Sequence, residues 1–335
     1  GFIMRRIWVL LVFFYALDLF GQAKSPCYQK AYDEIVAMLE GKTEISVKRA
    51  VFLAEYAYFD GKVDYQVDFC NEINRISSYV KRFINANHLL YYKTGKNIAL
   101  NEFFFKPWSG NNYSPYICDT QLDSDDDWSV QFIIPLLKTH KGQCRSLPWL
   151  YKILADEIGA EAYIVHAPRH AFIRYHDYDD FYPEDWVNLE LTSQQIQPEF
   201  WLKDYFDIKE ESIKAKTYLY SLTQIETIAN QLADLGFGYF RKFNVYDEFT
   251  LLCSDISLKY YPYNPTAIII KGRSLEALLM KYLEINGGCA DDYSKYIEAK
   301  LAILQKQLDS TFWTQETPEL RRRWEESLEY EIPNI

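Results

Sequence analysis

Apolar residues recur three or four positions apart through residues 28–92, and this spacing predicts helices. The second of these helices ends at residues 60–61, because glycine commonly follows the last residue of a helix. A third helix is expected over about residues 64–86. Residues 93–127 carry strong turn signals, such as Pro107, and are expected to be mostly irregular.

The pattern changes in the centre of the chain. A helix opens in residues 142–148 and is closed by Gly159. Short apolar runs with strand character follow it, at residues 162–165, 170–175 and 186–192. One helix followed by successive strands predicts an antiparallel sheet with the helix packed against it, which is an α+β core.

Beyond about residue 221 the helical spacing returns. Several positions there are close to those of a tetratricopeptide repeat, and Gly272 follows Gly236 by 36 residues, near the period of about 34. Because one or two such repeats rarely stand alone, we expect this region to pack on the core or to bind a protein partner.

The first 23 residues have the layout of a secretory signal peptide. A basic start at residues 4–6 precedes an apolar run over residues 7–20, and small residues precede a cut after Ala23. The run is shorter than the roughly 20 residues that a membrane-spanning helix needs. We therefore expect a periplasmic or secreted protein with no stable membrane span after removal of the signal. An uncleaved N-terminal membrane anchor is the alternative.

The composition excludes several classes of function. The chain of 335 residues has a net charge of −11, and glutamates surround its one basic cluster at residues 321–323, so nucleic acid is not an expected partner. Its six cysteines are too few for a disulfide scaffold, and no pair of them has metal-ligand spacing. The sequence also has no phosphate-binding or dinucleotide-binding fingerprint. We expect no metal site and no cofactor.

Three residues in the central part form the candidate site. Cys144 stands at the start of the predicted helix, where the helix dipole and amide groups favour a thiolate. His170 begins a strand, and Glu190 lies on the next strand, in a position to orient the imidazole. A nucleophile, a base and an orienting acid are the groups needed for acyl transfer through a thioester.

The segments around these residues resemble the bacterial transglutaminase-like superfamily, whose core is papain-like. Gly142–Pro148 is similar to its nucleophile segment, Ala167–His170 to its histidine segment, and Trp186–Glu190 to its Trp-x-x-x-Asp segment. The resemblance implies that Cys144 is the nucleophile, that His170 is the general base and acid, and that Glu190 orients the imidazole.

The resemblance extends beyond the core and covers roughly residues 45–290. Segments 48–53, 100–104 and 109–112 resemble the helical preface of one branch, whose members often carry tetratricopeptide repeats after the core. The expected domains are therefore a signal peptide (1–23), a helical preface with an irregular segment (24–127), a transglutaminase-like core (128–205) and a helical, degenerate tetratricopeptide-like region (206–335).

Some features of the site have alternatives. The family has Asp where this chain has Glu190, and Asn188 on the same strand face is a rival orienting residue. The Cys144 N–H and other amides at the helix start are expected to hold an oxyanion, with Gln143 as a candidate side-chain donor. His140, four residues before Cys144, is a candidate for the border of the site.

Two functions remain open. The favoured one is a secreted cysteine-dependent acyl-transfer enzyme that hydrolyses or transamidates an amide, in a peptide or a cell-wall stem. The alternative is a non-catalytic transglutaminase-like binding module that recognises an extended peptide or a protein partner, because some members of the branch lack the cysteine.

Overall fold

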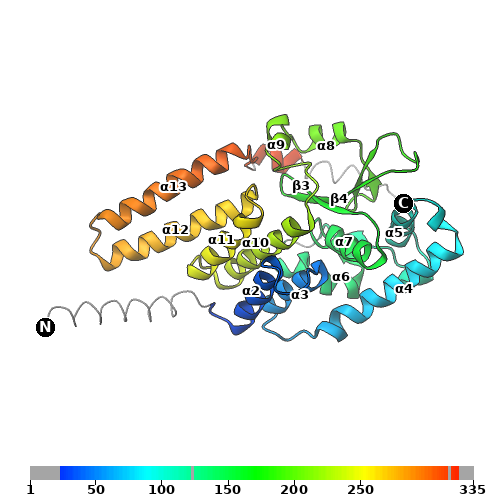
Figure 1. Cartoon of the computed structure of the whole chain (residues 1–335), viewed down its shortest axis with the longest axis horizontal. Coiled ribbons are helices and arrows are strands. Elements are labelled where there is room, and N and C mark those ends of the chain that lie inside the picture. Colours follow the sequence, from blue (N-terminus) through cyan, green and yellow to red (C-terminus); the bar gives the residue numbers. More distant parts are fainter. Residues whose placement is uncertain (1–22, 122–123, 316–317, 324–335) are drawn as a thin grey trace. The chain divides into compact units, whose positions relative to one another are not determined.

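The computed structural model describes residues 23–121, 124–315 and 318–323, so the expected signal peptide, apart from Ala23, lies outside the described residues. The contacts of the chain divide it into two compact units (Figure 1). Among the described residues, the helical unit contains 23–62 and Gln224–Asp309. The sheet unit contains the described residues of Val63–Thr223 and of 310–323. Within the described ranges, no helix combines the length and the apolar character that a membrane crossing requires.

The helical unit is built from two early helices of the chain and four later ones that pack on one another. Helix α10 contacts α2, α3 and α11, and α11 in turn contacts α12. Ser25, Asp247 and Asn264 cap α2, α11 and α12, because each side chain accepts a hydrogen bond from an amide of the first turn. The described helices of this unit are α2 (Pro26–Leu39), α3 (Val47–Tyr58), α10 (Gln224–Phe243), α11 (Glu248–Tyr260), α12 (Pro265–Ile285) and α13 (Asp292–Ser310).

Aromatic contacts join the two separate segments of the chain that make up this unit. Tyr28 of α2 meets Tyr239 of α10 edge to face, with ring centroids 5.1 Å apart, and Phe249 of α11 at 6.0 Å. These rings are buried, so they contribute much of the core that holds α2 to the later helices. The expected domain limits at residues 127/128 and 205/206 therefore do not coincide with the limits of the compact units.

The sheet unit has an antiparallel sheet of strand order β3-β4-β5-β6 and a short parallel pair, β1-β2. Its strands are β1 (Ile117–Cys118), β2 (Lys141–Gly142), β3 (Tyr163–Ala167), β4 (His170–His176), β5 (Trp186–Glu190) and β6 (Gln195–Ile196). Its α-helices are α4 (Asn71–Ala86), α5 (Gly95–Phe105), α6 (Ile133–Thr139), α7 (Ser146–Ile158), α8 (Glu199–Tyr205) and α9 (Glu210–Lys214). Shorter helical turns are η1 (Tyr65–Cys70), η2 (Leu89–Tyr91), η3 (Ser109–Asn111) and η4 (Trp128–Gln131). The prediction of an α+β fold is thus confirmed.

One sequence-based prediction needs correction. Helix α5 occupies residues 95–105, inside the segment expected to be irregular. The turn signals that suggested an irregular segment lie after the end of this helix. Leu100, Phe103 and Phe104 are buried at helical spacing, and Tyr151 of α7 packs on Phe104 with ring centroids 5.4 Å apart.

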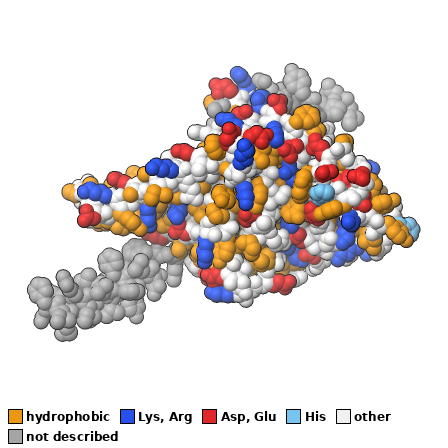
Figure 2. All heavy atoms as spheres, turned by 45° about the horizontal axis from the view of Figure 1, so that its top comes forward, with side chains coloured by type: hydrophobic (Ala, Val, Ile, Leu, Met, Phe, Trp, Pro, Cys, Tyr) orange, Lys and Arg blue, Asp and Glu red, His pale blue; other side chains and the backbone are white. Residues whose placement is uncertain are grey.

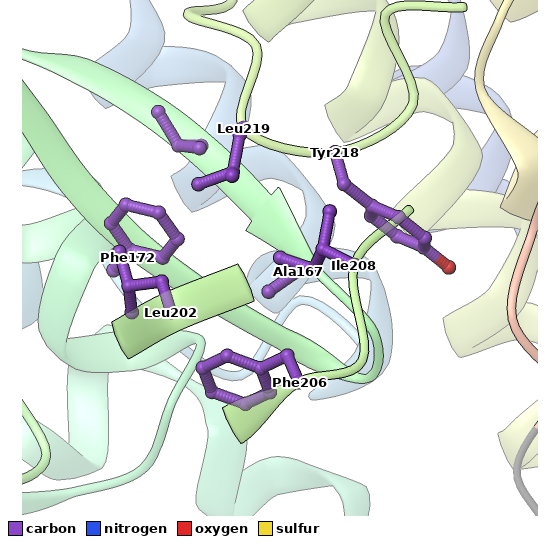
Figure 3. Close-up of a cluster of buried hydrophobic side chains, with 8 residues drawn as sticks. Ala167, Phe172, Leu202, Phe206, Ile208, Tyr218 and Leu219 are labelled. Carbon is purple, nitrogen blue, oxygen red and sulfur yellow. The ribbon is translucent and has the colours of Figure 1, made fainter. Parts of the chain in front are cut away.

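The sheet is covered on both faces, which fixes the direction of its side chains. Helix α7 contacts β3 and β4, and its Trp149 and Tyr151 are fully buried. A second cluster packs residues of β3 and β4 against α8 and the segment after it, and Figure 3 shows Phe172 of β4 beside Leu202 of α8. Because side chains alternate along a strand, α7 and α8 meet different residues of the same two strands.

Charged side chains of both signs are mixed on the surface. On the face drawn in Figure 2, Lys and Arg side chains alternate with Asp and Glu, and hydrophobic side chains lie between them. Such mixing is typical of a solvated protein surface.

Two glycines of the helical unit give a prediction for its stability. A Cβ atom at Gly236 on α10 would lie 3.1 Å from the Cβ atom of Cys253 on α11, whereas one at Gly272 on α12 would meet nothing within 4 Å. Gly236→Val should therefore destabilise the protein by about 2 kcal/mol through overpacking. Gly272→Ala should stabilise it by about 0.5–1 kcal/mol, because alanine favours a helix. Urea unfolding of both variants measures this, and equal stability of the two variants would contradict the close packing of α10 on α11.

Candidate active site

Cys144 lies in a tight turn between β2 and α7. The carbonyl of Gln143 accepts the N–H of Leu147 at 3.1 Å, and the hydroxyl of Ser146 accepts the N–H of Gln143 at 2.9 Å. A Cβ atom at Gly142 would lie 2.6 Å from the Ser146 hydroxyl, so only glycine permits this close approach. The turn sets Cys144 two residues before the first residue of α7, in agreement with the expected position at a helix start.

His170 and Glu190 come together because they stand at the ends of two paired strands. His170 is the first residue of β4 and Glu190 is the last residue of β5. The Nε2 atom of His170 lies 2.5 Å from the Oε2 atom of Glu190. The other carboxylate oxygen accepts the N–H of Thr192 at 3.1 Å and its hydroxyl at 2.8 Å. Both oxygens of Glu190 are thus engaged, and the carboxylate has a fixed orientation.

The imidazole of His170 is held on several sides. Its ring stacks on Phe206 with centroids 4.9 Å apart, and its side chain is 13% exposed. A carboxylate can only accept, so Nε2 carries the hydrogen that Glu190 receives. The Nδ1 atom is then the nitrogen left to interact with Cys144, which contributes to the raised pKa of His170. The Cys144 sulfur itself lies 3.9 Å from the carbonyl oxygen of Arg169.

The contact between His170 and Glu190 shifts the pKa values of both side chains. Burial works against a charged imidazole, but the negative charge of Glu190 and hydrogen bonds with Cys144 and Glu190 outweigh it and raise the pKa of His170 to about 10. Burial also opposes the charge of Glu190, yet His170 and the hydrogen bonds from Thr192 lower the pKa of that carboxyl. At neutral pH the two residues therefore form an imidazolium–carboxylate pair.

Cys144, His170 and Glu190 line one cavity of about 290 Å³. Part of its wall is aromatic and comes from α8 and the residue after it: Trp201, Tyr205 and Phe206. Another part comes from the end of β1 and the residues after it: Cys118, Asp119 and Thr120. The remaining lining residues are Gln143, Pro168, Arg169, Thr192 and Ser193. A molecule the size of an amino-acid side chain can therefore enter the cavity and reach the Cys144 sulfur beside the aromatic wall.

A second cysteine in the cavity was not anticipated from the sequence. Burial, followed by the proximity of Cys144 and of the Glu190 carboxylate, raises the pKa of Cys118 to about 12. Cys118 is therefore a neutral thiol at physiological pH and does not compete as a nucleophile. Its place in the site follows from the pairing of β1 with β2, where Cys118 lies opposite Gly142. The sequence offers no local signal for that pairing.

The other residues named from the sequence have different surroundings. Asn188 accepts a hydrogen bond from the Nε atom of Arg174 at 2.7 Å, so it does not hold the imidazole and Glu190 does. Gln143 lines the cavity and bonds to the carbonyl of Asp119 at 3.3 Å. The Nδ1 atom of His140 lies 2.7 Å from the carbonyl of Ser114, so its ring supports the chain before β1 and is not among the cavity-lining residues.

No protein-family model, curated protein or solved structure matches this chain. The function must therefore be inferred from the residues of the site and from their geometry. Among the described residues, no group of three or more His, Cys, Asp or Glu side chains is arranged to hold a metal ion.

The His170–Glu190 pair gives a prediction for stability against pH. The pKa of His170 is raised from 6.5, so its contribution is complete below about pH 6.5 and is lost as the pH rises toward 10. The pKa of Glu190 is lowered from 4.5, so its contribution is present above about pH 4.5 and is lost as the pH falls. Glu190→Gln should therefore cost about 3 kcal/mol at pH 6, as expected for a broken buried ion pair, and clearly less at pH 9.

Urea unfolding at the two pH values measures this difference, and Glu199→Gln is the matched control. Glu199 is a half-exposed carboxylate of the same unit that pairs with Arg174 and Lys203. Its partners do not titrate between pH 6 and pH 9, so its removal should cost about 1 kcal/mol or less at both values. A cost of Glu190→Gln that is the same at pH 6 and pH 9 would contradict the charged pair.

Proposed function

We propose that this protein is a cysteine-dependent acyl-transfer enzyme with a papain-like core of the transglutaminase-like kind. The observation that carries the proposal is the 2.5 Å contact between His170 and Glu190 in the cavity that also holds the Cys144 sulfur. The nucleophile precedes a helix, and that helix packs on the strand that carries the histidine. This arrangement brings the three groups of a cysteine–histidine–acid site together.

The charge state of the site defines the first chemical step. An imidazolium next to a sulfur stabilises the thiolate, which is the nucleophilic form. The thiolate of Cys144 attacks the carbonyl carbon of an amide, and the carbonyl oxygen becomes an oxyanion. We assign the Cys144 N–H and Gln143 as the donors to that oxyanion, because both belong to the turn that opens α7.

His170 then acts as the acid. Its Nδ1 proton passes to the leaving nitrogen, the C–N bond breaks, and the amine departs while the acyl group stays on Cys144 as a thioester. The neutral imidazole next accepts a proton from water or from an acceptor amine as that molecule attacks the thioester. The thiolate of Cys144 leaves, and the site returns to its starting state. Glu190 stabilises the imidazolium in each half of the cycle.

The surroundings of the site restrict the range of substrates that it can bind. A cavity of about 290 Å³ with an aromatic wall holds one or two residues of an extended chain, and a peptide or a cell-wall stem fits this description. The signal-peptide layout of residues 1–23 places such a substrate in the periplasm or outside the cell. The tetratricopeptide-like helices would then offer a surface for a protein partner.

Alkylation of Cys144 by iodoacetamide, followed by mass spectrometry from pH 6 to pH 9, tests the proposal. Cys289 is exposed and provides a reference thiol in the same digest. An ordinary thiol reacts about 50-fold more slowly at pH 6.5 than at pH 8.5. We expect the alkylation rate of Cys144 to fall by less than about threefold over this range in the wild type, because an adjacent imidazolium favours the reactive thiolate form of a cysteine.

The variants separate a working site from a merely reactive thiol. In His170→Ala, the alkylation rate of Cys144 should depend on pH as that of Cys289 does. In Glu190→Gln, the pH dependence at Cys144 should lie between those of the wild type and of His170→Ala. A wild-type Cys144 that follows Cys289, or that stays unlabelled in the folded protein, would overturn the enzyme proposal and leave the binding module as the function to pursue.

A further inference from the structure

Gln131 is buried next to the site but lies outside the cysteine–histidine–acid trio. It is the last residue of η4, its exposure is 6%, and it lies 13 positions before Cys144 in the chain. Its side chain reaches both neighbours of Cys144. The Oε1 atom accepts the backbone N–H of Arg145 at 3.2 Å, and the Nε2 atom donates to the Oε1 atom of Gln143 at 2.8 Å.

These bonds belong to a chain of hydrogen bonds whose direction is fixed at both ends. A backbone N–H, here that of Arg145, can only donate, and a backbone carbonyl, here that of Asp119, can only accept. Gln131 must therefore turn its oxygen toward Arg145 and its nitrogen toward Gln143. Gln143 must then turn its oxygen toward Gln131 and its nitrogen toward the Asp119 carbonyl, 3.3 Å away. Neither amide can flip without losing a bond.

The same residue also anchors the turn through its own backbone. The carbonyl of Gln131 accepts a hydrogen bond from the Nη1 atom of Arg145 at 3.2 Å. The Asp119 N–H donates to the carbonyl of Gly142 at 2.8 Å, so the far end of the chain of bonds is tied back to the same turn. One buried residue, Gln131, thus holds the residues before and after Cys144 in place.

We infer that Gln131 is a positioning residue for the acyl-transfer reaction, which orients the Gln143 amide and the Cys144 backbone toward the oxyanion. The inference rests on the proposed function. The bonds of Gln131 go to Gln143 and Arg145 and not to the sulfur or the imidazole, so it acts through these two residues. Oxyanion donors are effective only at the correct distance and angle, and loss of one typically costs about 10²–10³-fold in rate.

Two reactions at the Cys144 sulfur distinguish a role in positioning oxyanion donors from a general structural role. Acylation by p-nitrophenyl acetate passes through an oxyanion: the thiolate attacks the ester carbonyl, p-nitrophenolate leaves, and a thioester forms on Cys144. Alkylation by iodoacetamide displaces iodide from carbon and forms no oxyanion. A residue that positions oxyanion donors should affect the first reaction and spare the second.

The test measures both rates at pH 7 in the full-length wild type and in Gln131→Met. The variant keeps a side chain of similar length but can form neither amide bond. We expect acylation of Cys144 to slow by about 10-fold or more, while alkylation changes by less than about threefold. The matched control is Gln197→Met, in the same unit, where the glutamine is 8% exposed and its amide donates to Gln195. Both rates should stay at the wild-type level in this control.

A second variant covers the case in which Gln131→Met does not fold. Gln143→Leu breaks the same chain of bonds at a partly exposed position, and it should show the same selective loss of acylation. Where both single variants fold, the double variant should slow acylation by less than the product of the two single losses, because part of both effects passes through the Gln143 amide.

The outcomes distinguish this inference from the function on which it rests. Absence of acylation at Cys144 in the wild type would overturn both. Acylation in the wild type with an unchanged rate in Gln131→Met would overturn the role of Gln131 alone. Equal losses in acylation and alkylation would also overturn it, because they would show a structural rather than a positioning effect.

Discussion

The contact between His170 and Glu190 is the interaction on which the rest of the site depends. Two charges removed from water each carry a penalty of several kcal/mol, and only close geometry with further hydrogen bonds offsets it. Here the 2.5 Å contact and the two bonds from Thr192 provide that compensation. The pairing of Ile173 with Leu189 sets the register that brings the two residues together, and a slip of one position would turn Glu190 to the other face of the sheet.

The backbone next to His170 and Cys144 has a conformation that brings these two residues together. Residues 168 and 169 form the whole connection between β3 and β4, and Arg169 adopts a φ of 52°, where residues other than glycine and asparagine are uncommon. This turn makes His170 the first residue of its strand and points the Arg169 carbonyl at the Cys144 sulfur. Gly142 serves the other side of the site, because it lets β2 approach the start of α7. A strained hairpin turn and a close approach at glycine therefore bring histidine and cysteine to the same cavity.

The sequence predicted the parts of this arrangement that depend on local pattern. The helix after Cys144 and the strands that begin at His170 and Trp186 follow from hydrophobic spacing and from Gly159. The sequence favoured Glu190 as the orienting residue but left Asn188 as a rival, since both lie on one strand face. Only the register, which sets Asn188 opposite Arg174, separates the two residues. Contacts between distant segments could not be predicted either, because the local pattern of one segment carries no information about its partner. Such contacts are those of the buried Gln131, the Cys118 thiol, the aromatic wall from α8, and the packing of α2 against α10.

The most direct test of this account is an NMR titration of the His170 ring in the wild type and in Glu190→Gln, with the signal assigned through His170→Ala. The account predicts that His170 stays protonated from pH 6 to above pH 8 in the wild type, because its pKa is raised to about 10. In Glu190→Gln it should titrate at a clearly lower pH. A wild-type His170 that loses its proton near pH 6.5, as a solvated histidine does, would contradict the charged pair at the centre of the site.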